Sequence, residues 1–216
     1  MRKRTYFNSR NINSESLRMM ETLQRLSLVH TNMEIEIGKA ALLVLDMQKY
    51  FLEQKSHAYI PSGPVIIPVI QNLIDYFSMV RMPIFFTKHF NIPENAGMMG
   101  MWWKDAIDLN SQRAEIIEQL DISKGRILHK DRYDAFWDTN LDDMLKENGV
   151  EQVVITGVMT HLCCESTARS AFTRNYQVFF VIDGTATYTR ELHMASLLTL
   201  SHGFAKPILS HEVTDK

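Results

Sequence analysis

Residues 153–169 read V-V-I-T-G-V-M-T-H-L-C-C-E-S-T-A-R and contain the pattern that decides the fold. The apolar run 153–155 is typical of a strand that is buried on both faces of a parallel sheet. Gly157 interrupts this run, and about six residues later a helical pattern begins that carries Ala168 and Ala171 on one side. A strand, a tight turn and a helix in this order place Cys163 at or near the N-terminus of the helix.

The position of Cys163 is compatible with two interpretations. Unpaired backbone N–H groups and the helix dipole favour a thiolate at a helix N-terminus, which would suit a nucleophile. A buried structural cysteine is the alternative, because free cysteines are among the most buried residues of proteins. The position alone does not separate the two, so the decision depends on chemical partners elsewhere in the chain.

The composition indicates a single domain and gives no reason to expect a highly charged macromolecule or membrane as a partner. The 216 residues are 45% hydrophobic and carry a formal net charge of −2 at pH 7, so we expect neither nucleic acid nor an anionic membrane as a partner. No run of eighteen apolar residues indicates a membrane span, and no apolar stretch follows the basic N-terminus to make a secretory signal. Cys163 and Cys164 are adjacent and the only cysteines, which excludes a disulfide framework and predicts a cytoplasmic protein.

Apolar runs and amphipathic segments alternate along the chain. The predicted strands are 40–45, 84–87, 126–129, 153–155, 177–182 and 205–209, and the predicted intervening helices include 65–80, 111–118, 140–145 and 190–202. This alternation predicts right-handed βαβ units and a mostly parallel sheet of about six strands covered by helices on both faces. The expected fold class is α/β, a three-layer α/β/α Rossmann-like domain.

We expect this domain to span residues 39–216 and to follow an N-terminal extension, residues 1–38. A short amphipathic helix is predicted from Ser14, with Leu17, Met20 and Leu23 at helical spacing and Asn13 or Ser14 as its cap. Its apolar side packs either on its own domain or on a second subunit.

Three chemical groups stand at or just after predicted strand ends: Asp46, Lys130 and Cys163. The carboxyl ends of parallel strands share one edge of a sheet, so these distant residues are expected to converge. An ammonium group would stabilise a thiolate, and a carboxylate would accept the thiol proton and later activate water. His161 is a weaker candidate for the base, because the turn would aim it away from the nucleophile.

The sequence contains no motif for several other common types of active site. The chain lacks a G-x-S-x-G elbow, a P-loop and a G-x-G-x-x-G turn after the first strand. His89 has no second metal-binding residue at a suitable spacing, so we expect no metal and no cofactor. The segment 90–104, rich in methionine and tryptophan, is predicted to be either a lid over the site or a subunit interface.

Three segments together resemble the isochorismatase-like hydrolases, the cysteine hydrolase superfamily that includes nicotinamidases and N-carbamoylsarcosine amidases. They are L-L-V-L-D-M-Q with Asp46, H-K-D-R-Y-D-A-F with Lys130, and G-V-M-T-H-L-C-C-E-S-T-A-R with Cys163. The resemblance covers about residues 39–209 and implies an Asp–Lys–Cys triad, a cis peptide between Val158 and Met159, and an oxyanion hole formed by the N–H groups of Met159 and Cys163. It further implies hydrolysis of a small amide- or urea-type C–N bond through a thioester, a homo-oligomer (dimer or tetramer) and a packing role for Cys164.

Two departures from the family pattern limit what the resemblance implies. Nicotinamidases hold a metal with an Asp-x-His pair after the second strand, where this chain reads T-K-H over residues 87–89, so neither that metal nor that substrate is predicted. Isochorismatases split a vinyl ether and usually carry glycine at position 163, although several segments look closer to that branch than to nicotinamidases. Vinyl-ether hydrolysis, a non-catalytic binding protein and a redox pair of cysteines therefore remain alternatives. The substrate-binding candidates, which follow the relevant strand ends, are Phe51, Trp102, Trp103, Tyr133, Phe136 and His161.

Overall fold

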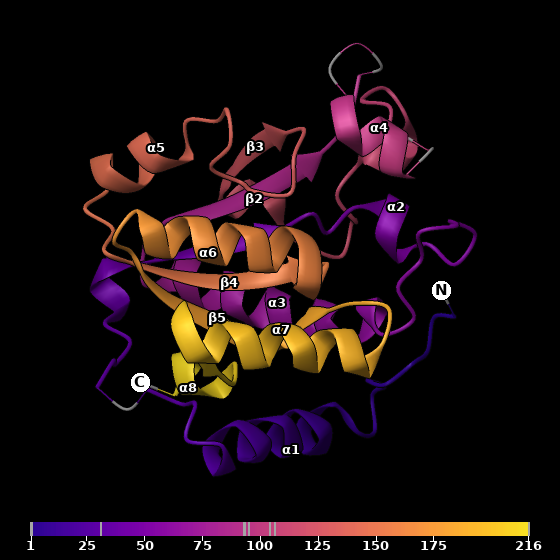
Figure 1. The fold of residues 1–216 in the computed structure, drawn as a ribbon. Helices are drawn as coiled ribbons and strands as arrows, with labels where there is room; N and C mark the ends of the chain where they lie inside the picture. The colour runs from indigo at the N-terminus through magenta and orange to yellow at the C-terminus, as the bar shows by residue number, and fades with distance from the viewer. Residues whose placement is uncertain are drawn as a thin grey trace.

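The computed structural model describes residues 2–30, 32–92, 94, 96–103, 105 and 107–215. A parallel six-stranded sheet forms the centre, in the order β3-β2-β1-β4-β5-β6 (Figure 1). The strands are β1 (Ala40–Leu45), β2 (Ile84–His89), β3 (Arg126–Lys130), β4 (Gln152–Val158), β5 (Gln177–Ala186) and β6 (Lys206–Ile208). The predicted α/β class and strand number are confirmed.

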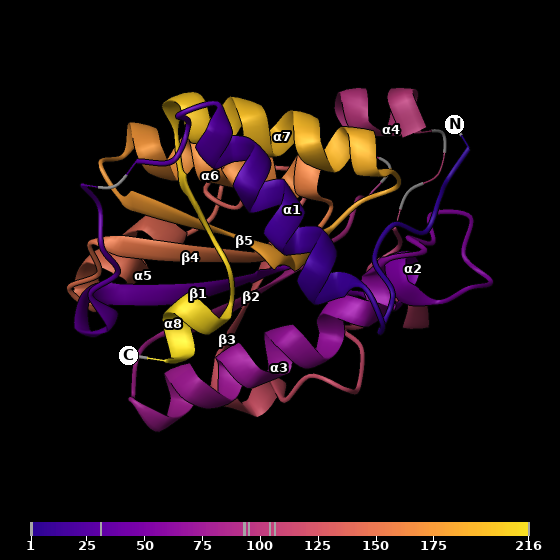
Figure 2. The ribbon, with the colours of Figure 1, turned by 90° about the horizontal axis from the view of Figure 1, so that it is seen from below.

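Helices cover both faces of this sheet, with α6 and α7 on one face and α3 on the other (Figure 2). The helices are α1 (Ile12–Arg25), α2 (Lys49–Leu52), α3 (Gly63–Met79), α4 (Gly97–Trp103), α5 (Leu141–Glu147), α6 (Glu165–Thr173), α7 (Arg190–Gly203) and α8 (His211–Thr214). Short 3₁₀ turns lie at Ile37–Lys39, Gln112–Ala114 and Ile122–Lys124. No helix in the described part of the chain has the length and apolar character needed to cross a membrane.

The predicted helix at 111–118 is wrong, because only the 3₁₀ turn Gln112–Ala114 forms there. Beyond it the backbone is extended and pairs with the segment after β1. The N–H of Lys49 donates to the carbonyl of Glu115 at 2.9 Å, and that of Ile117 donates to Met47 at 3.0 Å. These long-range bonds satisfy the backbone groups that a helix would otherwise have used.

The first helix packs on its own domain in this structure. It begins at Ile12, two residues earlier than predicted, where the side chain of Asn8 accepts a bond from the N–H of Asn11 at 3.1 Å. Met19 and Leu23 are buried, and the helix contacts β5 and α7. Leu17 and Leu26, on the outer side, are exposed.

Gly157 allows β1 and β4 to approach closely just before the turn that carries Cys163. Its φ is +109°, and a Cβ atom at this position would lie 2.1 Å from the carbonyl oxygen of Leu45. The register of β4 against β5 also shifts between Ile155 and Gly157. Glycine is therefore required here for both its backbone conformation and its lack of a side chain.

Candidate active site

Asp46, Lys130 and Cys163 meet at the carboxyl edge of the sheet. Asp46 follows β1, Lys130 ends β3, and Cys163 lies in the turn after β4. Lys130 Nζ is 2.7 Å from Asp46 Oδ2 and 3.5 Å from Cys163 Sγ. All three residues are buried. Because β2 separates β3 from β1, the lysine reaches across the end of β2 to contact the aspartate.

Asp46 is held in an uncommon conformation by Thr87 of β2. The φ of Asp46 is +51°, in the left-handed region that aspartate and asparagine enter more readily than most residues. Thr87 Oγ1 donates to Asp46 Oδ1 at 2.5 Å and accepts from the backbone N–H of Asp46 at 3.0 Å. The sequence analysis missed Thr87, because this contact depends on how β2 is placed beside β1.

Lys130 has several acceptors for its ammonium group. Besides Asp46, Nζ donates to the carbonyl oxygen of Arg132 at 2.9 Å and lies 3.5 Å from Nδ1 of His89. His89 Nε2 is in turn 3.0 Å from Asn91 Oδ1. Burial and the nearby Lys130 charge lower the pKa of His89 to about 4, so this imidazole is neutral at pH 7.

Cys163 lies in a wide π-helical turn, Thr160–Cys164, that leads directly into α6. We refer to these five residues as the nucleophile turn. Burial, followed by the negative charge of Asp46, raises the pKa of the Cys163 thiol, although Lys130 opposes the shift. The direction is the reverse of the one expected from a helix N-terminus, because burial and the nearby carboxylate together outweigh the opposing effect of Lys130. Both effects favour the thiol over the thiolate.

The charges of the other two residues stabilise each other. Burial alone would raise the pKa of Asp46, but Lys130, His89 and a hydrogen bond from Cys163 together hold it below its ordinary value. Burial opposes the ammonium form of Lys130, yet Asp46 and Cys163 raise its pKa overall. A carboxylate, an ammonium and a thiol are therefore present together at neutral pH, and the carboxylate can accept the proton of the thiol.

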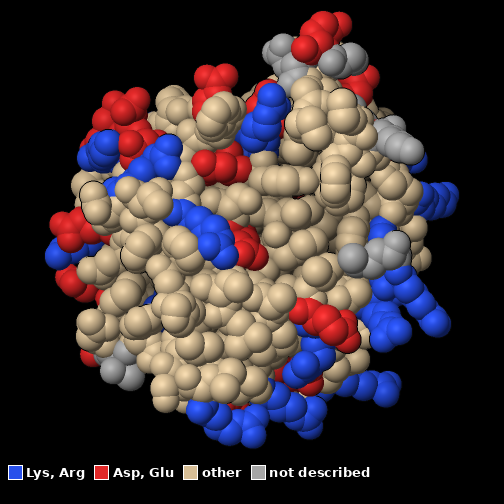
Figure 3. Space-filling model, in the orientation of Figure 1, with Lys and Arg blue, Asp and Glu red and all other residues tan. Residues whose placement is uncertain are grey.

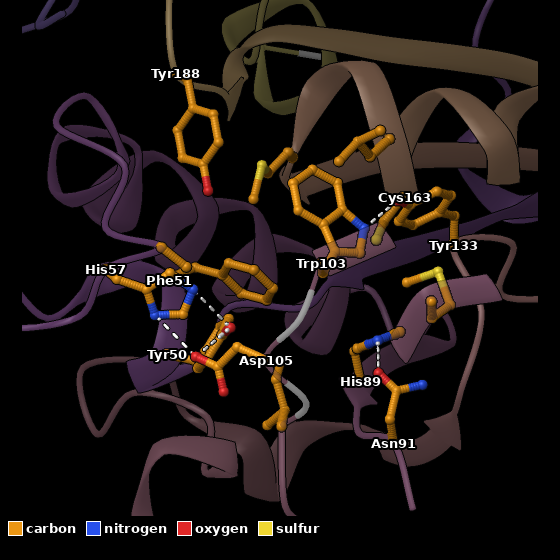
Figure 4. A pocket seen from close by; sticks show the side chains of 15 residues that line it. Tyr50, Phe51, His57, His89, Asn91, Trp103, Asp105, Tyr133, Cys163 and Tyr188 are labelled. Atoms are coloured by element: carbon orange, nitrogen blue, oxygen red, sulfur yellow. Dashed lines mark hydrogen bonds and ion pairs between the residues drawn. The ribbon is translucent and has the colours of Figure 1, made fainter. Parts of the chain in front are cut away.

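Cys163 opens into a cavity of about 140 Å³. Figure 4 shows Cys163, Tyr133 and Trp103 on one side and Tyr50, His57 and Asp105 on the other. The far group is linked by contacts of 3.0 Å between His57 Nδ1 and Asp105 Oδ2 and of 3.1 Å between Tyr50 Oη and His57 Nε2. The remaining lining residues are Phe51, Ala58, His89, Asn91, Met99, Ile107, Met159, Leu162 and Tyr188. The volume is comparable with the roughly 150 Å³ apolar cavity that accepts benzene.

Three of the six predicted substrate-binding residues line this cavity: Phe51, Trp103 and Tyr133. Trp103 Nε1 donates to Tyr133 Oη at 2.5 Å, which fixes two walls against each other. The segment 90–104 thus contributes a wall through α4, while its residues 93, 95 and 104 lie outside the described residues.

The other three lie away from the cavity. Trp102 is 72% exposed. Phe136 stacks on Tyr176 with ring centroids 6.0 Å apart. His161 faces Thr187, whose Oγ1 is 2.6 Å from His161 Nδ1. Position after a strand end therefore does not by itself bring a side chain into the site.

Charged side chains are unevenly spread over the face of the molecule seen in Figure 1. Figure 3 shows uncharged surface between α4 and α7, with most acidic and basic side chains towards the edge of this face. The peptide between Val158 and Met159 is cis, and Met159 lines the cavity beside Cys163. Cys164 faces the core, where it is fully buried.

The donor set near Lys130 does not suit a divalent cation. No group of three His, Cys, Asp or Glu residues in the described ranges could hold a metal ion. His89 and Asn91 are bonded to each other, and the Lys130 ammonium lies beside His89.

A model of the isochorismatase domain matches residues 40–212, which is most of the chain. The chain belongs to the isochorismatase family. It is 37% identical over 174 residues to "Nicotinamidase 3" of Arabidopsis thaliana, covering 77% of this chain and 82% of the relative. The structure of a cysteine hydrolase from Pseudomonas syringae pv. phaseolicola superposes with a TM-score of 0.81 at 25% identity, covering 87% of this chain and 95% of the other.

The chain is also similar to a bacterial protein of a different name. The chain is 30% identical to "Enterobactin synthase component B" of Escherichia coli over 181 residues, which are 82% of this chain and 63% of that relative. Several segments look closer to isochorismatases than to nicotinamidases, whereas over the whole alignments the identity is 37% to the plant nicotinamidase and 30% to the bacterial protein.

Proposed function

We propose that this member of a hydrolase family cleaves a C–N bond of a small amide or urea-type substrate with Cys163 as the nucleophile. The observation that carries the proposal is the placement of Lys130 Nζ 2.7 Å from Asp46 and 3.5 Å from Cys163, at the base of the cavity. A nucleophile, a base and a fixed positive charge within hydrogen-bond reach are the groups that acyl transfer requires.

The first half of the reaction forms a thioester. Asp46 accepts the proton of the Cys163 thiol as the sulfur attacks the carbonyl carbon, and Lys130 stabilises the developing thiolate. The backbone N–H groups of Met159 and Cys163 are the proposed donors to the oxyanion, each worth about 3–4 kcal/mol in comparable sites. The C–N bond then breaks, and the departing nitrogen takes the proton from Asp46.

The second half regenerates the enzyme. Asp46 accepts a proton from water while the water oxygen attacks the thioester carbon. The C–S bond breaks, the sulfur recovers the proton from Asp46, and the carboxylic or carbamic acid leaves. No charge is left on an unpaired buried group at either stage, which supports the assignment of Asp46 as acid and base in turn.

The shape of the cavity supports a small planar substrate. Phe51, Trp103 and Tyr133 provide apolar walls, and Tyr50, His57 and Asp105 provide hydrogen-bonding groups at the far side. A flat carboxamide or carbamoyl compound fits these walls with its reactive carbonyl at Cys163. The similarity to "Nicotinamidase 3" makes nicotinamide the first compound to test.

Ammonia release from nicotinamide, other aromatic carboxamides, ureas and N-carbamoyl compounds tests the proposal. Cys163→Ala should abolish release, and Cys164→Ala, which alters the adjacent but fully buried cysteine, should retain it. Rapid quenching followed by mass spectrometry should find the acyl group on Cys163. Equal activity of wild type and Cys163→Ala would overturn the proposal, and equal cleavage of isochorismate by both would favour vinyl-ether hydrolysis.

A further inference from the structure

The first described residues lie outside the isochorismatase match at 40–212, yet some of them contact residues that line the cavity. Tyr6 and Phe7 are buried, and the backbone N–H groups of both donate to Ser62 Oγ, at 3.0 and 3.1 Å. The carbonyl oxygen of Tyr6 accepts a bond from Asn11 Nδ2 at 2.9 Å. These bonds fix the segment between α1 and the start of α3.

The hydroxyl of Tyr6 is linked to both of the first two residues of the nucleophile turn. It lies 2.8 Å from His193 Nδ1, which is 3.2 Å from Thr160 Oγ1. It also accepts a bond from the backbone N–H of Thr187 at 3.0 Å, and Thr187 Oγ1 contacts His161. Two hydrogen-bonded paths therefore run from one hydroxyl to the turn that carries the nucleophile.

The groups on these paths are buried, except for the partly buried His161. His193 has no exposed surface, and burial lowers its pKa to about 3. Thr160 and Thr187 are likewise buried. His193 Nε2 is buried without a hydrogen-bond partner, so the contacts of this ring pass through Nδ1 alone. A buried hydrogen-bond network restricts its residues to few geometries, and deleting a member leaves a further donor or acceptor without a partner.

Two residues further towards the N-terminus contact the wall of the cavity. The N–H of Arg4 donates to the carbonyl of Tyr188 at 2.9 Å, and the ammonium of Lys3 lies 4.3 Å from the centre of the Tyr188 ring. Lys3 Nζ also donates to the carbonyl of His57. Tyr188 and His57 both line the cavity, and the Tyr188 hydroxyl points towards its interior (Figure 4).

We propose that residues 3–7 form a positioning segment for the active site: Tyr6 holds the nucleophile turn, and Lys3 holds the far wall of the substrate cavity. This inference rests on the proposed function for its kinetic readout. Tyr6 does not touch the reacting atoms; it acts through His193, Thr160 and Thr187. Loss of its hydroxyl should therefore lower kcat, whereas loss of the Lys3 contacts should raise KM.

Tyr6→Phe tests the first half, and Tyr176→Phe is the matched control. Both changes remove one hydroxyl from a buried tyrosine, but that of Tyr176 bonds Asp142 at 2.8 Å, away from the cavity. We expect Tyr6→Phe to lower kcat at least tenfold with KM changed less than twofold, and Tyr176→Phe to change neither. Equal kinetics of the two variants would overturn the role of Tyr6.

A second readout does not require a substrate. The rate at which iodoacetamide alkylates Cys163 can be measured by peptide mass spectrometry, and it should fall at least fivefold in Tyr6→Phe. A displaced sulfur is no longer beside the Asp46 carboxylate that accepts its proton or the Lys130 ammonium that stabilises the thiolate. An unchanged or faster rate would contradict the inference even if no amide proves to be a substrate. Should Tyr6→Phe fail to fold, Thr160→Val, which removes the same link at the turn, must show the slower alkylation.

Lys3→Met tests the second half, since it keeps the aliphatic stem and removes the ammonium that contacts Tyr188 and His57. We expect KM to rise at least threefold with kcat unchanged. Arg2→Met, one residue away on an exposed side chain, is the control and should leave KM unchanged. Unaltered KM in Lys3→Met would overturn the assignment of Lys3.

Discussion

Lys130 Nζ lies 2.7 Å from Asp46 Oδ2 with both side chains fully buried. Removing either partner leaves a buried charge without compensation, which typically costs about 3–5 kcal/mol. Asp46→Asn and Lys130→Met should each destabilise the fold by this amount, whereas the double variant should lose less than the sum. Asparagine suits position 46, because it tolerates the positive φ found there.

Urea denaturation of the two single variants and the double variant gives the coupling energy of the pair. Asp75 and Lys124 provide the control, since their 2.6 Å contact is partly exposed and should couple by less than about 1 kcal/mol. A coupling for the buried pair as small as that of the surface pair would show that the ion pair does not hold the site together. All three variants of the buried pair should be inactive.

The same ion pair predicts how stability depends on pH. The pKa of Asp46 is lowered, so its contribution is present above 3.8, the ordinary value, and is lost as the pH falls through the lower folded pKa. The pKa of Lys130 is raised, so its contribution is fully present below 10.5 and is lost as the pH rises through the higher folded pKa. The Tm difference between wild type and the double variant should therefore be constant between pH 6.5 and pH 9.0, above the ordinary pKa of His89 and below that of Cys163, because both of these groups also respond to the two charges; a change within that range would contradict the assigned shifts.

The thiol of Cys163 should titrate above the ordinary value of 9.0, because burial and Asp46 raise its pKa. Thiolate absorbance at 240 nm should be missing at pH 7 and should grow only above pH 9.0. Cys163→Ala identifies the contribution of this residue by difference. A thiolate that forms below pH 7 would mean that Asp46 is not the resting carboxylate and that Cys163 exists as an ion pair with Lys130.

Trp103 and Trp102 are adjacent and allow a matched comparison. Trp103 lines the cavity and is 39% exposed, whereas Trp102 is 72% exposed and lies outside it. Trp103→Ala should raise KM about tenfold or more, because it removes an apolar wall and the bond to Tyr133. Trp102→Ala should leave kcat and KM unchanged, and an equal effect of the two changes would show that α4 acts as a whole instead.

Gly157→Ala should prevent folding or destabilise the protein by more than about 3 kcal/mol, since the added Cβ meets the Leu45 carbonyl at 2.1 Å. Gly149→Ala separates this steric effect from backbone strain. Gly149 also has a positive φ, +64°, but nothing lies within 4 Å of an added Cβ, so the change should cost about 1–2 kcal/mol. Thermal and urea denaturation measure both effects, and similar losses would show that sterics at Gly157 are relieved by a shift of β1.

The sequence was sufficient to place Asp46, Lys130 and Cys163 together, because each stands at or just after the carboxyl end of a parallel strand. It was not sufficient for contacts that depend on register and side-chain direction. Thr87 and His89 reach the site only because β2 lies between β1 and β3. Phe136 and His161 follow strand ends but bond elsewhere.

The sequence analysis also failed to predict the residues of the far wall of the cavity, and the reason is physical. Tyr50 and His57 follow β1, Asp105 comes from the segment after α4, and Tyr188 follows β5. These positions share no periodicity, so only the folded chain brings them together. A chemical signal was nonetheless present, since tyrosine at 50 and 188 follows the carboxyl ends of strands that border the site.

The placement of β3 at the edge of the sheet also determines when the site can form during folding. Lys130 reaches Asp46 only after β3 has paired with β2, and Cys163 joins them only after β4 has paired with β1. Pairings between segments so far apart in the chain are slow to form. Enzymatic activity should therefore recover no earlier than the slowest of these pairings in a refolding experiment, which makes turnover a reporter of the complete sheet.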